Sequence, residues 1–213
     1  MTDSSSTSRS PAKDLFAQTA DRVSIYEVSP RDGLQNEPNI VPLEAKKQLI
    51  RALTEAGLRR IEITSFVSPK WVPQLADAEE LASTMTAPEG VSFSALCPNS
   101  KGLERALATG LPEIAVFMSA SETHNMKNIN KTIDRTIGVF SEIIPPALEA
   151  GVRVRGYLST MWGCPYEGPV SAEASVKIAR RLLDLGCYQV ALSDTIGTGT
   201  PRQTHELLSR ALD

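Results

Sequence analysis

The sequence predicts an α/β fold, an incomplete barrel of the TIM (β/α)₈ type with about six βα units present. Short apolar strands alternate with amphipathic helices, which is typical of parallel βα units joined by right-handed crossovers. The unusual polar residues follow the strands, at the end where barrel enzymes place their chemistry. An open doubly wound sheet also fits the alternation. No GxGxxG follows the first strand, which argues against the dinucleotide-binding version of that sheet.

Six strands are expected, most of them entered or closed by Gly or Pro, at residues 23–28, 61–64, 91–96, 113–118, 152–158 and 188–193. Helices are expected between them, most clearly at residues 43–56, 133–150 and 172–185, with a last helix running to Asp213. Gly57 ends the first of these helices as a C-terminal cap. The Pro145-Pro146 pair predicts a kink or a restart in the second.

Composition narrows the class of protein. With 22 Lys and Arg against 25 Asp and Glu, the net charge is −3, and there is no basic run to predict a nucleic-acid partner. No apolar stretch approaches the roughly 18 residues of a membrane helix. Three widely spaced cysteines predict a reducing compartment, which we take as the cytoplasm. Residues 1–20, rich in Ser and Thr, are expected to be a disordered tail before one domain at 21–213.

An adjacent cation and anion follow the first predicted strand, in the run SPRDG at residues 29–33. A carboxylate at the end of a strand can bind a hard cation through its oxygens. A guanidinium beside it can stabilise negative charge that develops on an oxygen. Arg-Asp pairs are common on solvated surfaces, so the pair alone carries little weight. Its position makes Arg31 and Asp32 candidate site residues.

A series of motifs resembles the hydroxymethylglutaryl-CoA lyases, a family within the metal-dependent lyases and acyltransferases that are built on TIM barrels. The motifs occur in order and with sensible spacing: SPRDGLQNE at 29–37, IEITSFVSPKWVPQ at 61–74, KNIN at 127–130, RGY at 155–157, GCPYEG at 163–168 and SDTIG at 193–197. One such motif would be weak. Several in register are specific, and the likeness runs from about Val23 to the C-terminus.

The resemblance implies a retro-Claisen cleavage of 3-hydroxy-3-methylglutaryl-CoA to acetyl-CoA and acetoacetate, assisted by Mg²⁺ or Mn²⁺. The cation would hold the substrate's hydroxyl and carboxylate oxygens and acidify the hydroxyl. Asp32 matches the family's carboxylate ligand to the metal, and Arg31 matches the residue that stabilises the enolate oxygen. Glu62 matches a catalytic acid at the end of the second strand, where it would fix the Arg31 guanidinium from behind.

Further residues are placed in the site by the same resemblance. Gln35, Ser65 and Tyr157 match positions that line the substrate pocket together with Arg31. Asp194 matches a residue at the same mouth and is a candidate for catalysis, with its proton-transfer role left open. The implied partner is a small-molecule acyl-CoA, and a completed barrel could form a homodimer.

The chain departs from the family pattern near its C-terminus. The family takes two more metal ligands from a His-x-His pair on the seventh strand and a catalytic cysteine from a glycine-rich loop after the eighth. The two histidines here, His124 and His205, do not form such a pair. Cys164 lies in a different Gly-Cys-Pro motif, for which we expect a place at the pocket rim. We therefore expect a lyase truncated at the C-terminus, inactive and poorly soluble as an isolated chain.

Other readings stay open. A citramalate- or homocitrate-type condensing enzyme, an aldolase and a non-catalytic barrel fragment all fit the fold, although RDGLQN and SFVSPKW favour the lyase. Lys46, Lys47 and Arg51 are expected to form a solvated basic face, with binding of CoA phosphates as the lesser alternative. Trp71 is expected to pack against the fold rather than to serve as a platform for a ligand.

Overall fold

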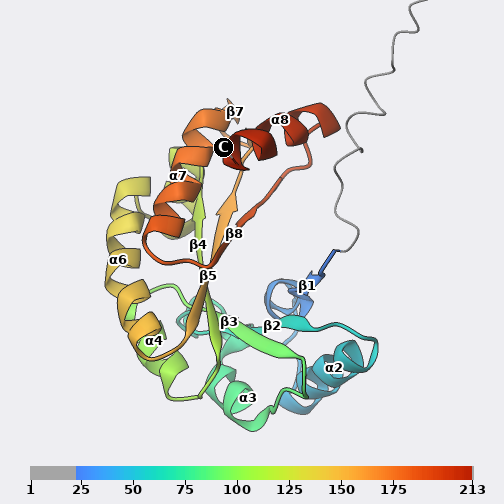
Figure 1. Ribbon diagram of the computed structural model, residues 1–213. Coiled ribbons are helices and arrows are strands. Elements are labelled where there is room, and N and C mark those ends of the chain that lie inside the picture. The colour runs from blue at the N-terminus through green and yellow to red at the C-terminus, as the bar shows by residue number, and fades with distance from the viewer. Residues whose placement is uncertain (1–22, 213) are drawn as a thin grey trace, which may run out of the picture.

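The computed structural model describes residues 23–212, so the tail expected at residues 1–20 lies outside the described part of the chain. Six parallel strands form one sheet in the order β1-β2-β3-β4-β5-β8. The strands are β1 Tyr26–Glu27, β2 Arg60–Ser65, β3 Ser92–Leu96, β4 Glu113–Ser119, β5 Arg153–Ser159 and β8 Gln189–Leu192. The sheet curls into a half-barrel, which confirms the predicted incomplete barrel of six units (Figure 1).

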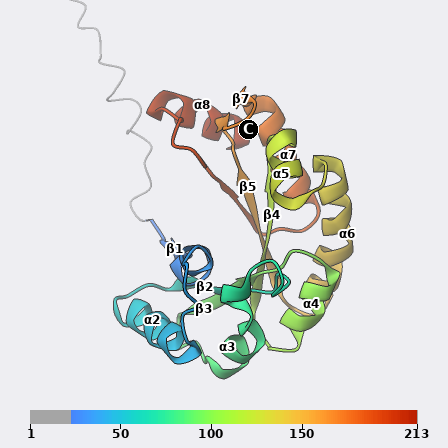
Figure 2. The ribbon, with the colours of Figure 1, turned by 180° about the vertical axis from the view of Figure 1, so that it is seen from behind.

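Helices cover the convex side of the curled sheet, and the concave side lies open, as both ribbon views show (Figure 2). The α-helices are α2 Leu43–Glu55, α3 Ala78–Thr84, α4 Ser100–Leu107, α5 Glu122–Ile129, α6 Ile133–Glu149, α7 Ala172–Asp184 and α8 Pro201–Leu212. A short π-helix, η1 Ser29–Gly33, and a 3₁₀ turn, η2 Pro73–Leu75, follow β1 and β2. A small antiparallel hairpin pairs β6 Gly163–Cys164 with β7 Gly168–Pro169.

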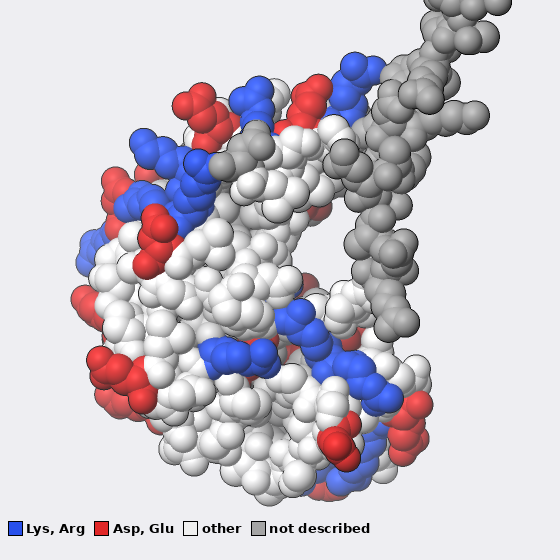
Figure 3. All heavy atoms as spheres, in the orientation of Figure 1, with Lys and Arg blue, Asp and Glu red and all other residues white. Residues whose placement is uncertain are grey.

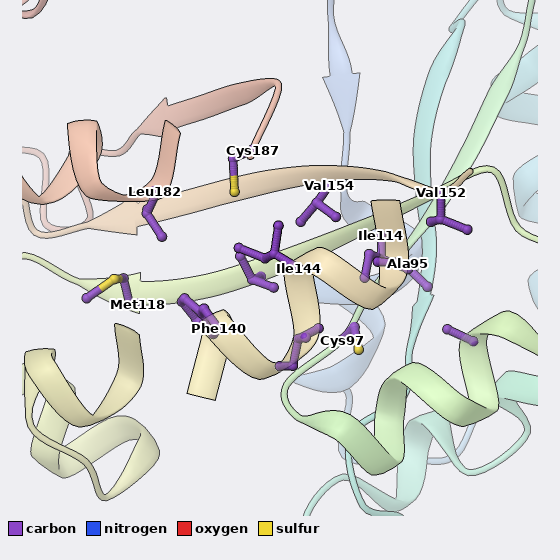
Figure 4. Packing of buried hydrophobic residues seen from close by; sticks show 14 of the residues in the cluster. Ala95, Cys97, Ile114, Met118, Phe140, Ile144, Val152, Val154, Leu182 and Cys187 are labelled. Carbon is purple, nitrogen blue, oxygen red and sulfur yellow. The ribbon is translucent and has the colours of Figure 1, made fainter. Parts of the chain in front are cut away.

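Period-two alternation along the strands separates an apolar outer face from a polar inner face. In β5, Val154 and Leu158 are fully buried in the hydrophobic core, whereas Arg155 bonds Gln189 of the neighbouring β8 and Tyr157 bonds Glu62 of β2. Helix α6 contributes Phe140 to the core, as the close-up shows (Figure 4). Burying one such side chain contributes about 1.5–3 kcal/mol, so the helices hold the sheet mainly from its convex side.

Two predicted elements differ from the structure. The first strand was expected at residues 23–28, but it is only Tyr26–Glu27, because the chain turns at once into η1 with Pro30 buried near its start. The Pro145-Pro146 pair does not interrupt α6, which runs as one helix from Ile133 to Glu149. Each proline removes one amide donor from the helix ladder, but both lie within five residues of the end of α6, and the helix continues past them.

Two polar segments that follow β4 and β5 hold regular structure. Helix α5 lies within residues 119–130, and Ser121 caps it by accepting the amide of His124 at 3.1 Å. The segment at residues 160–168 folds back into the β6–β7 hairpin. Their Ser, Asn, Gly and Pro content favoured loops in the sequence, but capping and hairpin pairing satisfy the same backbone groups.

The basic face expected on α2 is wrong at Lys46. Its side chain is 1% exposed, and its ammonium donates to the Asp77 carboxylate at 2.7 Å and to the Gln74 carbonyl at 2.5 Å. The expectation for Trp71 is also wrong, because its side chain is 83% exposed and does not pack into the fold.

Candidate functional site

The π-helix η1 brings Arg31 and Asp32 to the end of β1. The amides of both residues bond to the carbonyl of Val28, at 3.0 and 2.7 Å. Glu27 closes the turn by accepting the amide of Ser29 at 2.7 Å. The sequence folds this way because Pro30 fixes its own φ and has no amide hydrogen to satisfy, so the turn can begin there. Arg31 thereby lies beside the neighbouring strand β2, where its side chain contacts Glu62.

The Arg31 guanidinium meets the carboxylate of Glu62, which lies in the middle of β2. Its Nε donates to Glu62 Oε1 in an ion pair, and the Glu62 side chain is fully buried. The pairing follows from the sheet register, in which Glu27 aligns with Ile61 and so places the end of β1 beside Glu62. The Arg31 side chain is 11% exposed, and its Nη2 has no hydrogen-bond partner among the described residues.

Tyr157 completes the shell around Glu62 from β5. Its hydroxyl donates to Glu62 Oε2 at 2.9 Å, so both oxygens of the buried carboxylate accept a hydrogen bond. The Arg155 guanidinium lies 4.6 Å from the centre of the Tyr157 ring and 4.1 Å from that of Tyr26. Stacking of this kind holds the Tyr157 ring in place.

The protonation of this cluster follows from burial and charge. Burial is the largest influence on Glu62 and raises its pKa, while Arg31 and the Tyr157 hydroxyl act in the opposite sense. Burial disfavours charged Arg31, but Glu62 outweighs this effect and the pKa of the guanidinium is raised. Burial and then the Glu62 charge raise the pKa of Tyr157. The cluster therefore presents a fixed cation and a neutral phenol.

Asp32 points outward from the same turn and is half-exposed. Its Oδ1 accepts from Arg31 Nη1 at 2.7 Å and from Gln35 Nε2 at 3.2 Å. Among residues 23–212, no group of three or more His, Cys, Asp or Glu side chains gathers closely enough to hold a metal ion. A lone carboxylate is a poor Mg²⁺ site, because that ion needs several well-placed oxygens. The described residues alone do not make a complete metal site.

The other predicted site residues make no direct bond to Arg31 or Glu62. Gln35 joins the cluster through its bond to Asp32. Ser65 is fully buried at the end of β2, where its hydroxyl accepts the amide of Val67 at 3.2 Å. Asp194 follows β8, and its two oxygens accept the amides of Thr198 at 3.1 Å and of Gly199 at 2.7 Å. That carboxylate organises its own loop and makes no bond to the Arg31 cluster.

The histidines and Cys164 lie apart from this cluster. His205 is exposed on α8, and His124 lies on α5. Cys164 is buried in the hairpin and accepts a hydrogen bond from the Ser121 hydroxyl at 2.9 Å. Burial alone would raise the pKa of this thiol, but the bonds from Ser121 and nearby amides lower it. These contacts tie the hairpin to the start of α5.

The sequence reasoning missed the part that Arg155 plays. It lies inside the half-barrel between two tyrosine rings, 7% exposed, and bonds Gln189 at 3.3 Å. The alternation in RVRGYLS, residues 153–159, could have revealed that Arg155 and Tyr157 share one face of β5. Lys and Arg side chains also border the hollow of the concave side in the space-filling view (Figure 3).

No helix in the described part of the chain combines the length and the apolar character that crossing a membrane requires.

Known proteins match this chain along nearly its whole described length. The HMGL-like family model matches residues 22–213. The mitochondrial hydroxymethylglutaryl-CoA lyase of Bos taurus is 49% identical over 191 residues, and the cytoplasmic 3-hydroxy-3-methylglutaryl-CoA lyase of Danio rerio is 49% identical over 190. The alignments cover 90% and 89% of this chain but only 59% and 57% of those proteins. The chain thus spans less than three fifths of these relatives.

A solved structure shares the fold at similar coverage. The HMG-CoA lyase from A. baumannii, in complex with coenzyme A and 3-methylmalate, superposes with a TM-score of 0.84 at 38% identity. The match covers 89% of this chain and 62% of that one.

Proposed function

This chain belongs to the HMGL-like family, and on that premise we propose that it carries the enolate-stabilising half of a 3-hydroxy-3-methylglutaryl-CoA lyase site. The reaction splits one carbon–carbon bond of the thioester substrate, giving acetoacetate and acetyl-CoA. Names of relatives that share nearly half of its residues support this substrate. A citramalate- or homocitrate-type condensing enzyme and a bare barrel fragment are the weaker alternatives.

One observation carries the proposal: the Arg31 guanidinium is held by a buried carboxylate, and its Nη2 has no partner among the described residues. When the bond breaks, negative charge develops on the thioester oxygen of the leaving enolate. A donor already fixed in place needs no reorganisation as that charge appears, and one such donor supplies about 2.7–4 kcal/mol. Glu62, itself held by Tyr157, fixes the guanidinium through Nε, and Asp32 accepts from Nη1, which leaves Nη2 for the substrate.

Substrate binding is proposed for Gln35, Ser65 and Tyr157 along with Arg31. Gln35 and Tyr157 bond the two carboxylates that hold the guanidinium, and Ser65 ends the strand that carries Glu62. Asp194 is proposed as a catalytic residue, and a substrate that reached it would have to compete with the two loop amides it now accepts. The same two amides fix the orientation of the Asp194 carboxylate.

A divalent cation, Mg²⁺ or Mn²⁺, is proposed as the cofactor, with Asp32 as one of its ligands. The support is chemical: a half-exposed carboxylate next to the oxyanion donor is the ligand type that these ions prefer. Substrate oxygens and waters would supply further ligands, as is usual for Mg²⁺. When bound, the cation would acidify the substrate hydroxyl.

The cytoplasm is the proposed compartment, supported by three free cysteines, all buried. Relatives with both mitochondrial and cytoplasmic names occur, so the names do not decide the point. Homodimerisation of a completed barrel is likewise a proposal.

The experiment joins this chain to the C-terminal part of the Danio rerio lyase that the alignment leaves uncovered. The purified hybrid, with Mg²⁺, should convert 3-hydroxy-3-methylglutaryl-CoA to acetoacetate. It should not condense acetyl-CoA with 2-oxo acids. The isolated chain should show no turnover in the same assay. A folded hybrid that condenses 2-oxo acids, or that cleaves nothing, would contradict the proposal.

A further inference from the structure

Trp71 is the most exposed large aromatic side chain in the described residues, with 83% of its surface free. Its neighbour Lys70 is exposed too. Isolated apolar side chains on a surface need no explanation, but a bare indole beside a cation is a well-suited surface for a flat, negatively charged ligand.

The turn that presents Trp71 is fixed rather than loose. The amide of Trp71 donates to the carbonyl of Ser68 at 2.9 Å, closing the turn. Arg105 holds the start of this segment by donating to the carbonyls of Phe66 and Val67 at 3.1 and 3.2 Å. An aromatic surface on an anchored turn can bind a ligand without a further ordering cost.

A buried ion pair anchors the other end of the segment. The Lys46 ammonium donates to the carbonyl of Gln74 and is held by Asp77, so η2 is pinned to α2. Gln74 in turn donates its side-chain amide to the carbonyl of Glu37 at 3.0 Å. That bond ties the Trp71 turn to the segment that runs on from Arg31 and Asp32. The indole therefore lies on the same end of the half-barrel as the oxyanion donor.

We propose that Trp71 and Lys70 form a purine-nucleotide platform, on which the adenine of the acyl-CoA stacks while Lys70 faces its phosphates. This inference rests on the proposed function for the identity of the ligand, and it assigns a subsite for the part of that ligand remote from the reacting bond. Stacking on an indole needs no base-specific contact, since every purine offers a flat face. A lysine ammonium contributes a point charge to phosphate binding.

The chain offers a clean optical test, because its two tryptophans are Trp71 and Trp162. Trp162→Phe leaves Trp71 as the sole indole emitter. Coenzyme A and adenosine 3′,5′-bisphosphate should both quench its fluorescence on titration, whereas pantetheine, which lacks the nucleotide, should not. Trp71→Ala should weaken binding of adenosine 3′,5′-bisphosphate about tenfold by calorimetry, and Trp71→Phe should retain most of it. Lys101→Met, exposed on α4, serves as the charge control for Lys70→Met.

Three results would overturn the platform. They are equal quenching by pantetheine, no response to either nucleotide, and a concentration-dependent blue shift showing that a second copy of the chain covers Trp71. Because Trp71 is exposed, its variants should keep the parent's circular dichroism and melting temperature. If the hybrid binds nucleotide but does not cleave the substrate, the lyase function is wrong and the platform stands. If Trp71→Ala changes neither kcat nor KM for cleavage, the platform is wrong and the lyase function stands.

Discussion

Glu62→Gln tests the core of the site, since it removes one charge and almost no volume. The Glu62 side chain is fully buried, bonded to Arg31 through one oxygen and to Tyr157 at 2.9 Å through the other. The glutamine oxygen can still accept one of these hydrogen bonds, but the NH₂ group that replaces the second oxygen cannot accept the other. Hydrogen bonds to a charged group contribute about 1.5–3 kcal/mol each.

Two figures bound the expected loss. Removing one partner of a buried ion pair costs about 3–5 kcal/mol when the other charge is left alone. Here Arg31 keeps Asp32 at 2.7 Å and is 11% exposed, so its charge is not stranded. We therefore expect Glu62→Gln to lower the free energy of unfolding by about 2–3 kcal/mol. Urea unfolding followed by circular dichroism measures this as a lower midpoint at an unchanged slope.

A double-mutant cycle with Arg31→Met isolates the pair. Arg31→Met alone leaves a buried carboxylate with a phenol as its partner, so the double variant should lose less than the two single losses added together. The expected coupling is about 2 kcal/mol, and a value below about 0.5 kcal/mol would refute the reasoning. Glu79→Gln, in a half-exposed pair with Arg105, is the matched control and should cost about 1 kcal/mol or less.

Asp77→Asn should cost about 2–4 kcal/mol in urea unfolding, because it leaves the buried Lys46 ammonium without its carboxylate. Gly186→Ala should lower the melting temperature by an amount equivalent to about 2 kcal/mol, since φ is +109° and a Cβ would meet a side-chain atom at 2.5 Å. Burial raises the pKa of Cys97 and of Cys187 from 9.0 to about 12, so folding holds both thiols protonated. Their contribution to stability is complete below pH 9 and is lost as the pH rises toward 12, which melts at increasing pH should show.

Each of these has a control within the chain. Lys47→Met removes the partner of Glu44, whose carboxylate is 70% exposed and stays solvated, and should cost less than about 0.5 kcal/mol. Gly110→Ala, at φ +76° with no atom within 4 Å of the added Cβ, should cost about 1 kcal/mol. Cys187→Ala should shrink the alkaline loss. Equal effects in variant and control, or stability that is flat through this pH range, would contradict the packing described above.

The strand–helix alternation was predictable because each strand carries its own period-two pattern and its own breakers. The contact between Arg31 and Glu62 was placed only by resemblance, because it depends on the register between β1 and β2. Nothing local could show that Lys46 is buried: its partner Asp77 is 31 residues away, and the pair forms only when η2 packs on α2. Trp71 was predicted to pack and is exposed, because its local sequence is the same for a large aromatic in the core and for one on an anchored surface turn.

The most direct test of the central claim is the kcat for 3-hydroxy-3-methylglutaryl-CoA cleavage by the hybrid enzyme, with Arg31 and with Arg31→Met. We expect a loss of about 10²–10³-fold, the effect of removing one fixed oxyanion donor, and no change in Lys101→Met, exposed on α4. A folded Arg31→Met hybrid that loses less than about tenfold would show that this guanidinium does not stabilise the enolate.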